Sequence, residues 1–273
     1  MDSVNFVKIA WFGKHFGEEP PLVGEAGAGG VFFTGCNLRC VFCQNYQISQ
    51  QGMGKDYSLE EFAGIMLDLQ KQGALNIDLV TPTIWAERIK KAVKKAREKG
   101  LMIPIVWNSN GYENTEMIRE LEGVVDIYLP DFKYGDNELA EKYSGVKGYI
   151  EKAKAAIEEM LKQVGHLQIS EDGIAKKGII VRHMILPNNI ENSFKVLELL
   201  HDIDKNIFIH LMAQYEPIYQ ADKFPELGRP ITQKELDRVF DKLVVLGFEN
   251  GWVQDLESHA SFIPDFTKDN PFV

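Results

Sequence analysis

The order of strand-like and helix-like segments limits the fold of this chain more than any other feature of its sequence. Short apolar runs, which are typical of buried strands, alternate with longer amphipathic runs, which are typical of helices. Strands that alternate with helices form a parallel sheet with right-handed crossovers. The expected strands are 30–35, 77–80, 102–107, 124–129, 179–185 and 207–212. The sequence therefore predicts an α/β fold, a partial (β/α)6 TIM-like barrel.

The predicted helices follow these strands and set the domain organisation. One begins at Ser58, and the others cover 84–99, 115–122, 149–164, 191–203 and 232–246. Six pairs are two short of the closed eightfold barrel. Residues 1–28 and 253–273 do not follow the repeat, and we expect them to cover the open barrel or its mouth. We predict a single domain with an N-terminal extension (1–28), a partial barrel (29–252) and a C-terminal tail (253–273).

Composition excludes several classes of protein. With 273 residues, of which 45% are hydrophobic, the chain has enough apolar mass for a large core and is not disordered. A net charge of −10 disfavours nucleic acid and anionic membranes, because both recruit clustered cations. The sequence contains no run of eighteen apolar residues that could span a membrane, and we find no signal-peptide pattern in its first residues. We expect a cytoplasmic, monomeric protein.

All three cysteines lie within eight residues, as Cys36, Cys40 and Cys43. Close spacing of this kind suits a metal better than a disulfide framework. Structural zinc takes four ligands, and a 4Fe-4S cluster usually takes four cysteines, so three cysteines would leave one iron open for a substrate or cofactor. A zinc site completed by His15 and three buried thiols without a metal remain as alternatives.

The residues around these cysteines resemble a known superfamily. Gly35-Cys36-Asn37-Leu38-Arg39-Cys40-Val41-Phe42-Cys43 matches the CxxxCxxC signature of the radical S-adenosylmethionine (SAM) enzymes, with an aromatic residue before the third cysteine. The lead-in Phe32-Phe33-Thr34 and the following Gln44-Asn45 resemble the pyruvate formate-lyase activating enzyme family. His15-Phe16-Gly17-Glu18-Glu19-Pro20-Pro21 resembles a less characterised branch of that family.

This resemblance implies two cofactors, a 4Fe-4S cluster and SAM. Cys36, Cys40 and Cys43 match the cluster ligands, and SAM chelates the fourth iron in the family. One electron then cleaves the sulfonium C–S bond, which gives methionine and a 5′-deoxyadenosyl radical that abstracts a hydrogen atom. Matching positions imply that further residues bind SAM: Phe42, Thr81, Pro82, Asn108, Asn110, Asp131, Arg182, Met212 and Gln214.

Three of these positions depart from the family pattern. Val80-Thr81-Pro82-Thr83 stands where the family usually has a Gly-Gly-Glu type motif. Asn108 replaces an acid, which puts a monovalent cation site in doubt because hard cations favour charged oxygen ligands, and Gln214 replaces a histidine. For two other positions a structural role competes: Phe42 as a core aromatic, and Arg182 as a surface ion pair.

Two further regions allow a functional and a structural interpretation. The cationic helix 87–99 could dock an acidic flavodoxin or ferredoxin that delivers the electron, or could be a solvated face with Glu87 paired to Lys91. Trp11, His15, Glu18 and Glu19 either recognise a substrate or partner, or cap the open barrel.

The resemblance implies a radical SAM oxidoreductase that abstracts hydrogen from a glycine of a partner protein, a glycyl radical enzyme. Action of the same chemistry on a small molecule or RNA is the nearest alternative, and the negative net charge makes RNA less attractive. A non-catalytic iron-sulfur protein is an alternative from another class. It would leave the polar residues at the strand ends unexplained.

Overall fold

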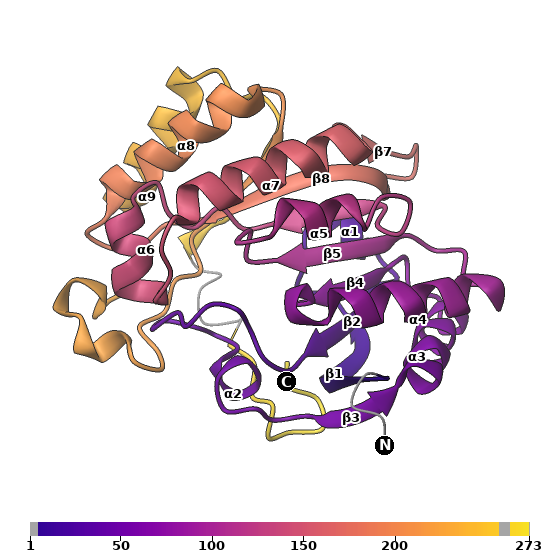
Figure 1. The fold of residues 1–273 in the computed structure, drawn as a ribbon. Coiled ribbons are helices and arrows are strands. Elements are labelled where there is room, and N and C mark those ends of the chain that lie inside the picture. Colours follow the sequence, from indigo (N-terminus) through magenta and orange to yellow (C-terminus); the bar gives the residue numbers. More distant parts are fainter. Residues whose placement is uncertain (1–4, 257–262, 273) are drawn as a thin grey trace.

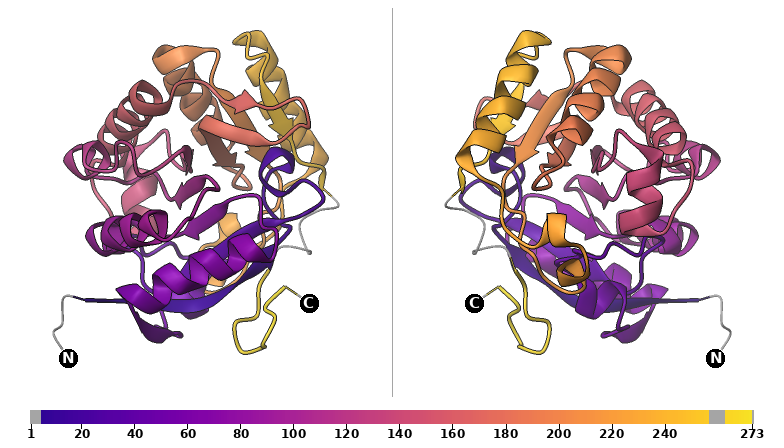
Figure 2. Two further views of the ribbon diagram at one scale, coloured as in Figure 1. Left: turned by 90° about the vertical axis from the view of Figure 1, so that its right-hand side faces the viewer. Right: turned by 90° about the vertical axis from the view of Figure 1, so that its left-hand side faces the viewer.

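The structure is a computed structural model that describes residues 5–256 and 263–272 (Figure 1). Parts of both predicted flanking segments, namely residues 1–4, 257–262 and 273, lie outside the described residues. A strongly curved sheet has the strand order β10-β9-β8-β6-β5-β4-β2-β1-β3, and β7 pairs with β8 beside it. The helices lie on the outside of this curve (Figure 2). The sheet is open between its two edges and does not close into a barrel.

The central part of the sheet confirms the predicted α/β fold. From β2 to β10 neighbouring strands run parallel, as right-handed strand–helix units require. These strands are β2 (Ala28–Phe33), β4 (Ile77–Val80), β5 (Ile105–Ser109), β6 (Ile127–Pro130), β8 (Ala175–Met184), β9 (Phe208–Met212) and β10 (Gly251–Val253). The main outer helices are α3 (Leu59–Lys71), α4 (Ala86–Glu98), α5 (Thr115–Arg119), α7 (Tyr149–Val164), α8 (Ile190–Asp204) and α9 (Gln233–Val245).

Helix starts agree best with the prediction where a side chain caps the helix. Ser58 and Glu61 form a reciprocal capping box at α3, and Thr232 and Glu235 form another at α9, so four backbone groups are satisfied locally. The prediction missed α6 (Asn137–Ser144), although Asp136 caps its start and Gly145, at φ 69°, ends it. It also missed the shorter elements: α1 (Pro20–Val23), α2 (Tyr46–Ser49), β7 (Gln168–Ile169), η1 (Thr83–Trp85), η2 (Ala221–Lys223) and η3 (Pro225–Leu227).

The N-terminal segment contributes strands as well as a cover. β1 (Phe6–His15) pairs antiparallel with β2 and with β3 (Lys55–Ser58), and thereby extends the sheet at one edge. After β1 the chain turns under the barrel into α1. Leu22 of α1 is fully buried against inward-facing side chains of the parallel strands, which are Val106, Ile127, Leu129, Ala175 and Ile180. Residues 15–23 therefore form a plug at the N-terminal end of the barrel, which we call the N-terminal plug.

The described part of the C-terminal tail covers another side of the barrel interior. Phe272 packs against Trp11 and Phe32, with ring centroids 5.0 and 5.2 Å away. The amide of Phe266 donates to the Gln47 side chain on α2 at 2.8 Å. Figures 1 and 2 show this segment in yellow beside α2 and β1. The tail thus joins the first strand to the loop region that follows β2.

Candidate functional site

The three cysteines lie in one loop that leaves the C-terminal end of β2. The loop begins at Gly35, whose φ of 88° favours glycine and where a Cβ would displace the end of the Ile84 side chain. Its middle is fixed by backbone hydrogen bonds to the end of α6: Arg39 N donates to Ser144 O at 3.0 Å, and Val41 N donates to Tyr143 O at 2.9 Å. All three cysteines are free. The loop therefore presents three thiols in a defined arrangement.

Each thiol has a polar neighbour from a different element. The pairs are Cys36 with Asn110 Nδ2 at 3.3 Å, Cys40 with Ser144 Oγ at 3.0 Å, and Cys43 with Ser49 Oγ at 3.2 Å. Burial raises the pKa of the Cys40 thiol to about 12 and that of Cys43 to about 11. Such thiols lose their protons only to a positive centre, because metal binding and deprotonation are coupled. Hydrogen bonds to cysteine sulfur also tune iron-sulfur potentials.

A cavity of about 740 Å³ opens in front of this loop, inside the curve of the sheet. This volume is within the usual range for a small-molecule site. Predicted site residues line it: Cys36, Cys40, Phe42, Cys43, Thr81, Asn108, Asn110, Asp131, Arg182, Met212 and Gln214. Pro82 is absent from the lining and precedes the short helix η1. Its ring therefore gives the cavity no wall.

The alternation of side chains along the parallel strands explains how these residues meet. Every second residue of a strand points to the same face, so the inward positions of β5 are 106 and 108, and those of β8 are 180, 182 and 184. Near the N-terminal plug the inward side chains are apolar. Further along the strands they become polar, and they form the cavity wall as Asn108, Asp131, Arg182 and His210.

Thr81 has an unusual backbone at the point where the sequence departs from the family pattern. Its φ is 60°, a conformation that costs a β-branched residue about 1–3 kcal/mol. The backbone amide of Thr81 donates to Asn108 O at 2.9 Å, which fixes the turn after β4. A glycine would adopt this conformation without strain. Thr81 thus keeps a glycine-like turn and adds a hydroxyl side chain to the cavity lining.

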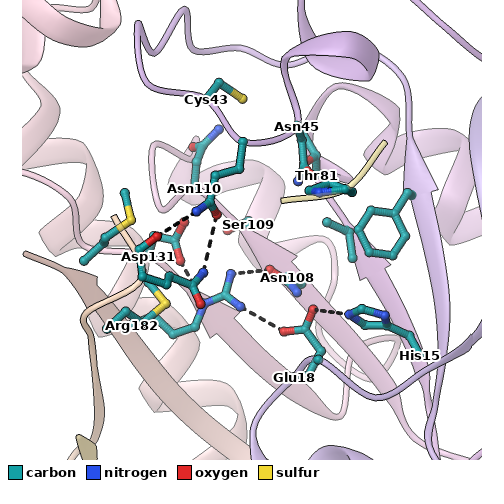
Figure 3. A pocket seen from close by; sticks show the side chains of 18 of the residues that line it. His15, Glu18, Cys43, Asn45, Thr81, Asn108, Ser109, Asn110, Asp131 and Arg182 are labelled. Carbon is teal, nitrogen blue, oxygen red and sulfur yellow. Dashed lines mark hydrogen bonds and ion pairs between the residues drawn. The ribbon is translucent and has the colours of Figure 1, made fainter. Parts of the chain in front are cut away.

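Arg182 is the centre of a buried ion-pair network (Figure 3). Its Nε donates to Asp131 Oδ1 at 2.9 Å, its Nη1 to Glu18 Oε2 at 3.0 Å, and its Nη2 to Asn108 Oδ1 at 2.6 Å. The side chain is 14% exposed, so the alternative of a surface ion pair is wrong. Although burial opposes ionisation, the Arg182 and Lys133 charges hold the pKa of Asp131 below its usual value. Each of the three guanidinium nitrogens therefore donates to an acceptor of the protein.

The structure explains why position 108 holds an amide and not the acid of the family pattern. Asn108 accepts from Arg182, and its Nδ2 donates to Asp78 Oδ2 at 3.4 Å. Asp78 is fully buried in β4, and burial, followed by the Glu18 charge, raises its pKa well above the ordinary value. A second carboxylate at 108 would face Asp78 with like charge. The acid that Asn108 lacks is therefore present one strand away.

The N-terminal plug adds two carboxylates to the same cavity. Glu19 Oε1 lies 2.7 Å from His210 Nδ1, and Glu18 Oε1 lies 3.7 Å from His15 Nε2. Burial raises the pKa of Glu18 to about 7 and lowers the pKa of His15 to about 4. His15 and Glu18 appear on the opposite side of the cavity from Cys43 in Figure 3. We call Glu18, Glu19, His15 and His210 the acidic floor.

The remaining predicted residues form the wall between the cysteine loop and β9. Phe42 is buried and packs on Tyr215, with ring centroids 5.8 Å apart, so it is both a core aromatic and a lining residue. The Gln214 side chain accepts from Gln254 Nε2 at 2.9 Å, and its backbone oxygen accepts from Gln44 Nε2 at 2.9 Å. Three amide side chains thus replace the single histidine of the family pattern.

Several residues of the site escaped the sequence analysis. Ser49 and Ser144 carry no motif, and only the fold brings them to a thiol. Lys133, by contrast, belongs to the element Asp131-Phe132-Lys133, which matches the family's Asp-x-Lys pattern; its Nζ lies 2.5 Å from Asp131 Oδ2 and lines the cavity. Asp78 could have been found from the sequence, because an acid within the apolar strand Ile77–Val80 is unusual and indicates a buried polar site.

The zinc alternative finds no support in the geometry. Among residues 5–256 and 263–272, no three His, Cys, Asp or Glu side chains surround one point as a single metal ion requires. His15, the proposed fourth ligand, instead contacts Glu18 and the ring of Phe272. Thiols that each bind a different iron of one cluster have no need to meet at one point.

A family model of the radical SAM superfamily matches residues 31–169, about half of the chain. The protein belongs to this superfamily. An uncharacterised protein of Methanocaldococcus jannaschii is 33% identical over 237 residues, 83% of this chain and 64% of that protein. The pyruvate formate-lyase-activating enzyme of Clostridium pasteurianum is 26% identical over 182 residues, 65% of this chain and 69% of that enzyme. The chain thus spans just under two thirds of the first relative.

Solved structures support the fold. Methylornithine synthase superposes with a TM-score of 0.54 at 17% identity, over 80% of this chain and 61% of its own. Streptococcus suis SuiB, bound to its precursor peptide SuiA, superposes with a TM-score of 0.55 at 12% identity, over 85% of this chain and 50% of SuiB. At these identities the likeness extends to the fold alone. It confirms the open, mostly parallel barrel.

The cofactors of this superfamily are a 4Fe-4S cluster and SAM, and the residues present fit both. Three thiols with polar neighbours face one cavity, and that cavity has room for a small molecule beside them. A cluster held by three cysteines supplies an open iron and one electron. In the described part of the chain no helix is long and apolar enough to cross a membrane.

Proposed function

We propose that this protein is a glycyl radical enzyme activase, which uses SAM at a 4Fe-4S cluster to abstract hydrogen from a glycine Cα of a partner protein. The observation that carries the proposal is the triad of free thiols at the edge of a 740 Å³ cavity. With a cluster and SAM bound, one electron from the cluster would break the sulfonium C–S bond to give methionine and a 5′-deoxyadenosyl radical, and transfer of the glycine hydrogen would leave 5′-deoxyadenosine and a glycyl radical. The 26% identity to a pyruvate formate-lyase-activating enzyme supports it.

In this proposal each part of the cavity has one task. Cys36, Cys40 and Cys43 hold the cluster, and the neighbouring Phe42, Asn110 and Thr81 orient SAM. Asp131, Asn108 and Arg182 bind polar groups of SAM, while Met212 and Gln214 contact its nucleoside part. The N-terminal plug and the C-terminal tail exclude water, which protects a radical from side reactions. We therefore treat 1–28, 29–252 and 253–273 as parts of one catalytic domain, in the cytoplasm, where thiols stay reduced.

The electron would enter next to the cysteine loop. Trp85 Nε1 donates to Thr34 O at 2.8 Å, and the side chain of Ile84, 47% exposed, lies against Gly35. Ile84 and Trp85 lead directly into α4, which carries several lysines and arginines. We propose that a flavodoxin or ferredoxin docks on this surface. Some of these cations are already paired: Lys90 bonds to Glu87 at 3.0 Å, where the sequence predicted a pair with Lys91, and to Glu120.

The test begins with anaerobic reconstitution with iron and sulfide, followed by dithionite and SAM. Wild-type protein should release 5′-deoxyadenosine, whereas Cys40→Ala should lose the product. Glu98→Gln, an exposed site on α4, is the matched control and should behave as wild type. Far-UV circular dichroism checks that each variant is folded. A loaded, reduced cluster that gives no product and whose spectrum SAM does not change would favour the electron-carrier alternative.

The glycyl step has its own readout. With a candidate glycyl radical enzyme whose glycine carries deuterium at Cα, deuterium should appear in 5′-deoxyadenosine, and an organic radical should appear in the electron paramagnetic resonance spectrum. Deoxyadenosine that forms without deuterium, with every candidate protein, would shift the function to another substrate. A small molecule is then the second candidate, because the N-terminal plug lines the cavity with charged side chains.

A further inference from the structure

The acidic floor contains carboxylate oxygens that the protein itself does not satisfy. Glu19 is 1% exposed and lines the cavity, yet its Oε2 has no hydrogen-bond partner among the described residues. Glu18 Oε2 is bound by Arg182, whereas the nearest cation-forming group to its Oε1 is His15, at 3.7 Å. A buried acceptor without a donor is costly. Glu19 therefore keeps a carboxylate oxygen without a donor, and Glu18 keeps one that His15 approaches at 3.7 Å.

The charges around the floor are also unbalanced. Four acids, Glu18, Glu19, Asp78 and Asp131, surround two permanent cations, Arg182 and Lys133. Burial keeps His15 neutral, so it adds no positive charge near neutral pH. Carboxylates in a buried site need a compensating cation or have to retain protons. A bound cation would reduce this excess of negative charge.

The cations already present are engaged with the protein's own acceptors, with which an anionic ligand would have to compete. Arg182 uses Nε, Nη1 and Nη2 on Asp131, Glu18 and Asn108, and Lys133 is bonded to Asp131 at 2.5 Å. An alkyl ammonium or guanidinium group fits better, since its N–H groups match carboxylate oxygens with charge-assisted bonds. Apolar walls beside the floor, Phe32, Met184 and Phe272, can cover the carbon stem of such a ligand.

The floor lies away from the proposed cluster. His15 pairs in register with Ala28, the first residue of β2, whereas the cysteine loop follows Phe33 at the other end. Five residue steps separate Ala28 from Phe33 by about 17 Å, and Glu18 spans part of this length because it bonds to Arg182. A ligand anchored on the floor would extend toward the cysteine loop. That orientation suits a substrate whose reacting carbon lies several bonds from its cationic group.

We propose that Glu18 and Glu19 form a binding subsite for a cationic group of the substrate, an alkyl ammonium or guanidinium. The subsite rests on the proposed radical SAM function, because it names the substrate class of the same cavity. It serves a free amine or the basic side chain of a peptide equally, since the recognised group is the same.

The test uses reconstituted, full-length protein and two probes that differ only in charge, n-butylammonium and n-butanol. Saturation-transfer difference NMR near neutral pH should show saturable binding of n-butylammonium and at least about tenfold weaker binding of n-butanol. Glu18→Gln and Glu19→Gln should each weaken n-butylammonium by about tenfold, while the exposed control Glu98→Gln should not. Equal binding of both probes, or unchanged binding in both floor variants, would overturn the proposal. The comparison of the two probes in wild-type protein tests the proposal even if a variant fails to fold.

A competition arm separates the substrate from SAM, which also carries positive charge. SAM and n-butylammonium that bind together support a substrate subsite. Displacement of n-butylammonium by SAM overturns it, because the floor would then belong to the SAM site. Failure of the proposed function would give a different result: no 5′-deoxyadenosine would form, while n-butylammonium would still bind. A longer peptide with a terminal lysine, compared with n-butylammonium, then distinguishes a peptide from a free amine.

Discussion

The two ends of the cavity are built in different ways. At the cysteine end, eight consecutive residues carry all three thiols, and neutral side chains such as Asn110, Ser144 and Ser49 accompany them. At the other end, the acidic floor joins the Arg182 network, whose charged groups come from the N-terminal plug, β4, the end of β6, β8 and β9, far apart in sequence. At the cysteine end, the spacing of three cysteines in one loop positions the reaction centre. The other end depends on the whole fold and is expected to be more sensitive to substitution and to pH.

The largest effect is expected from removal of the cation at the centre of the network. Arg182→Met should lower the free energy of unfolding by about 3–5 kcal/mol, because it leaves Asp131 and Glu18 buried without their partner. Urea unfolding at neutral pH measures this. Arg119→Met is the matched control, since Arg119 is exposed and its pair with Glu159 should be worth less than about 1 kcal/mol. Similar losses in both variants would show that the floor is no more demanding than the surface.

A smaller effect should follow from pH at the floor. Burial raises the pKa of Glu18 to about 7 from a usual 4.5, so Glu18 stabilises the fold below pH 4.5 and this contribution is lost as pH rises to 7. His15, with a pKa lowered to about 4, acts oppositely: stability is lost as pH falls from 6.5 to 4. The two contributions offset each other in wild type.

Glu18→Gln should therefore expose the His15 contribution. The free energy of unfolding of this variant should rise more steeply between pH 4.5 and 7 than that of wild type, by up to about 3 kcal/mol. Chemical denaturation across this range measures the slope. The double variant with His15→Gln should be flatter again. Parallel pH profiles for wild type and Glu18→Gln would contradict the assignment of the raised pKa.

The smallest effect concerns the cysteine end. Ser144 Oγ donates to Cys40 Sγ and lies 2.6 Å from Tyr134 Oη, fully buried. Ser144→Ala should make the cluster harder to reduce, by some tens of millivolts, because a hydrogen bond to sulfur favours the more negative state. Potentiometry on reconstituted protein reads the shift, with Ser170→Ala, remote from the cysteines, as control. An unchanged potential would show that this hydrogen bond does not influence the cluster.

The comparison also shows which predictions the sequence supported. Buried strands such as Ile77–Val80 and helices with capping boxes were recognisable because their signals are local. β1 was missed because alternation ends after Ile9, where the register to β2 shifts. The cysteine motif was found from spacing alone. The acidic floor and its neighbours were predicted only in part. Glu18 and Glu19 were identified through the family resemblance, whereas Asp78 was included in an expected apolar strand.

By itself, the sequence determined the strand–helix repeat, the three thiols in one loop and the superfamily, since each depends on neighbours within a few residues. Tertiary structure decided that Ser49 and Ser144 accompany these thiols, that Asn108 bridges Asp78 and Arg182, and that the N-terminal plug brings two acids to the cavity. One such contact joins Glu19 and His210, which are 191 positions apart. The energies of such contacts depend on burial and mutual charge, which exist only once the chain has folded.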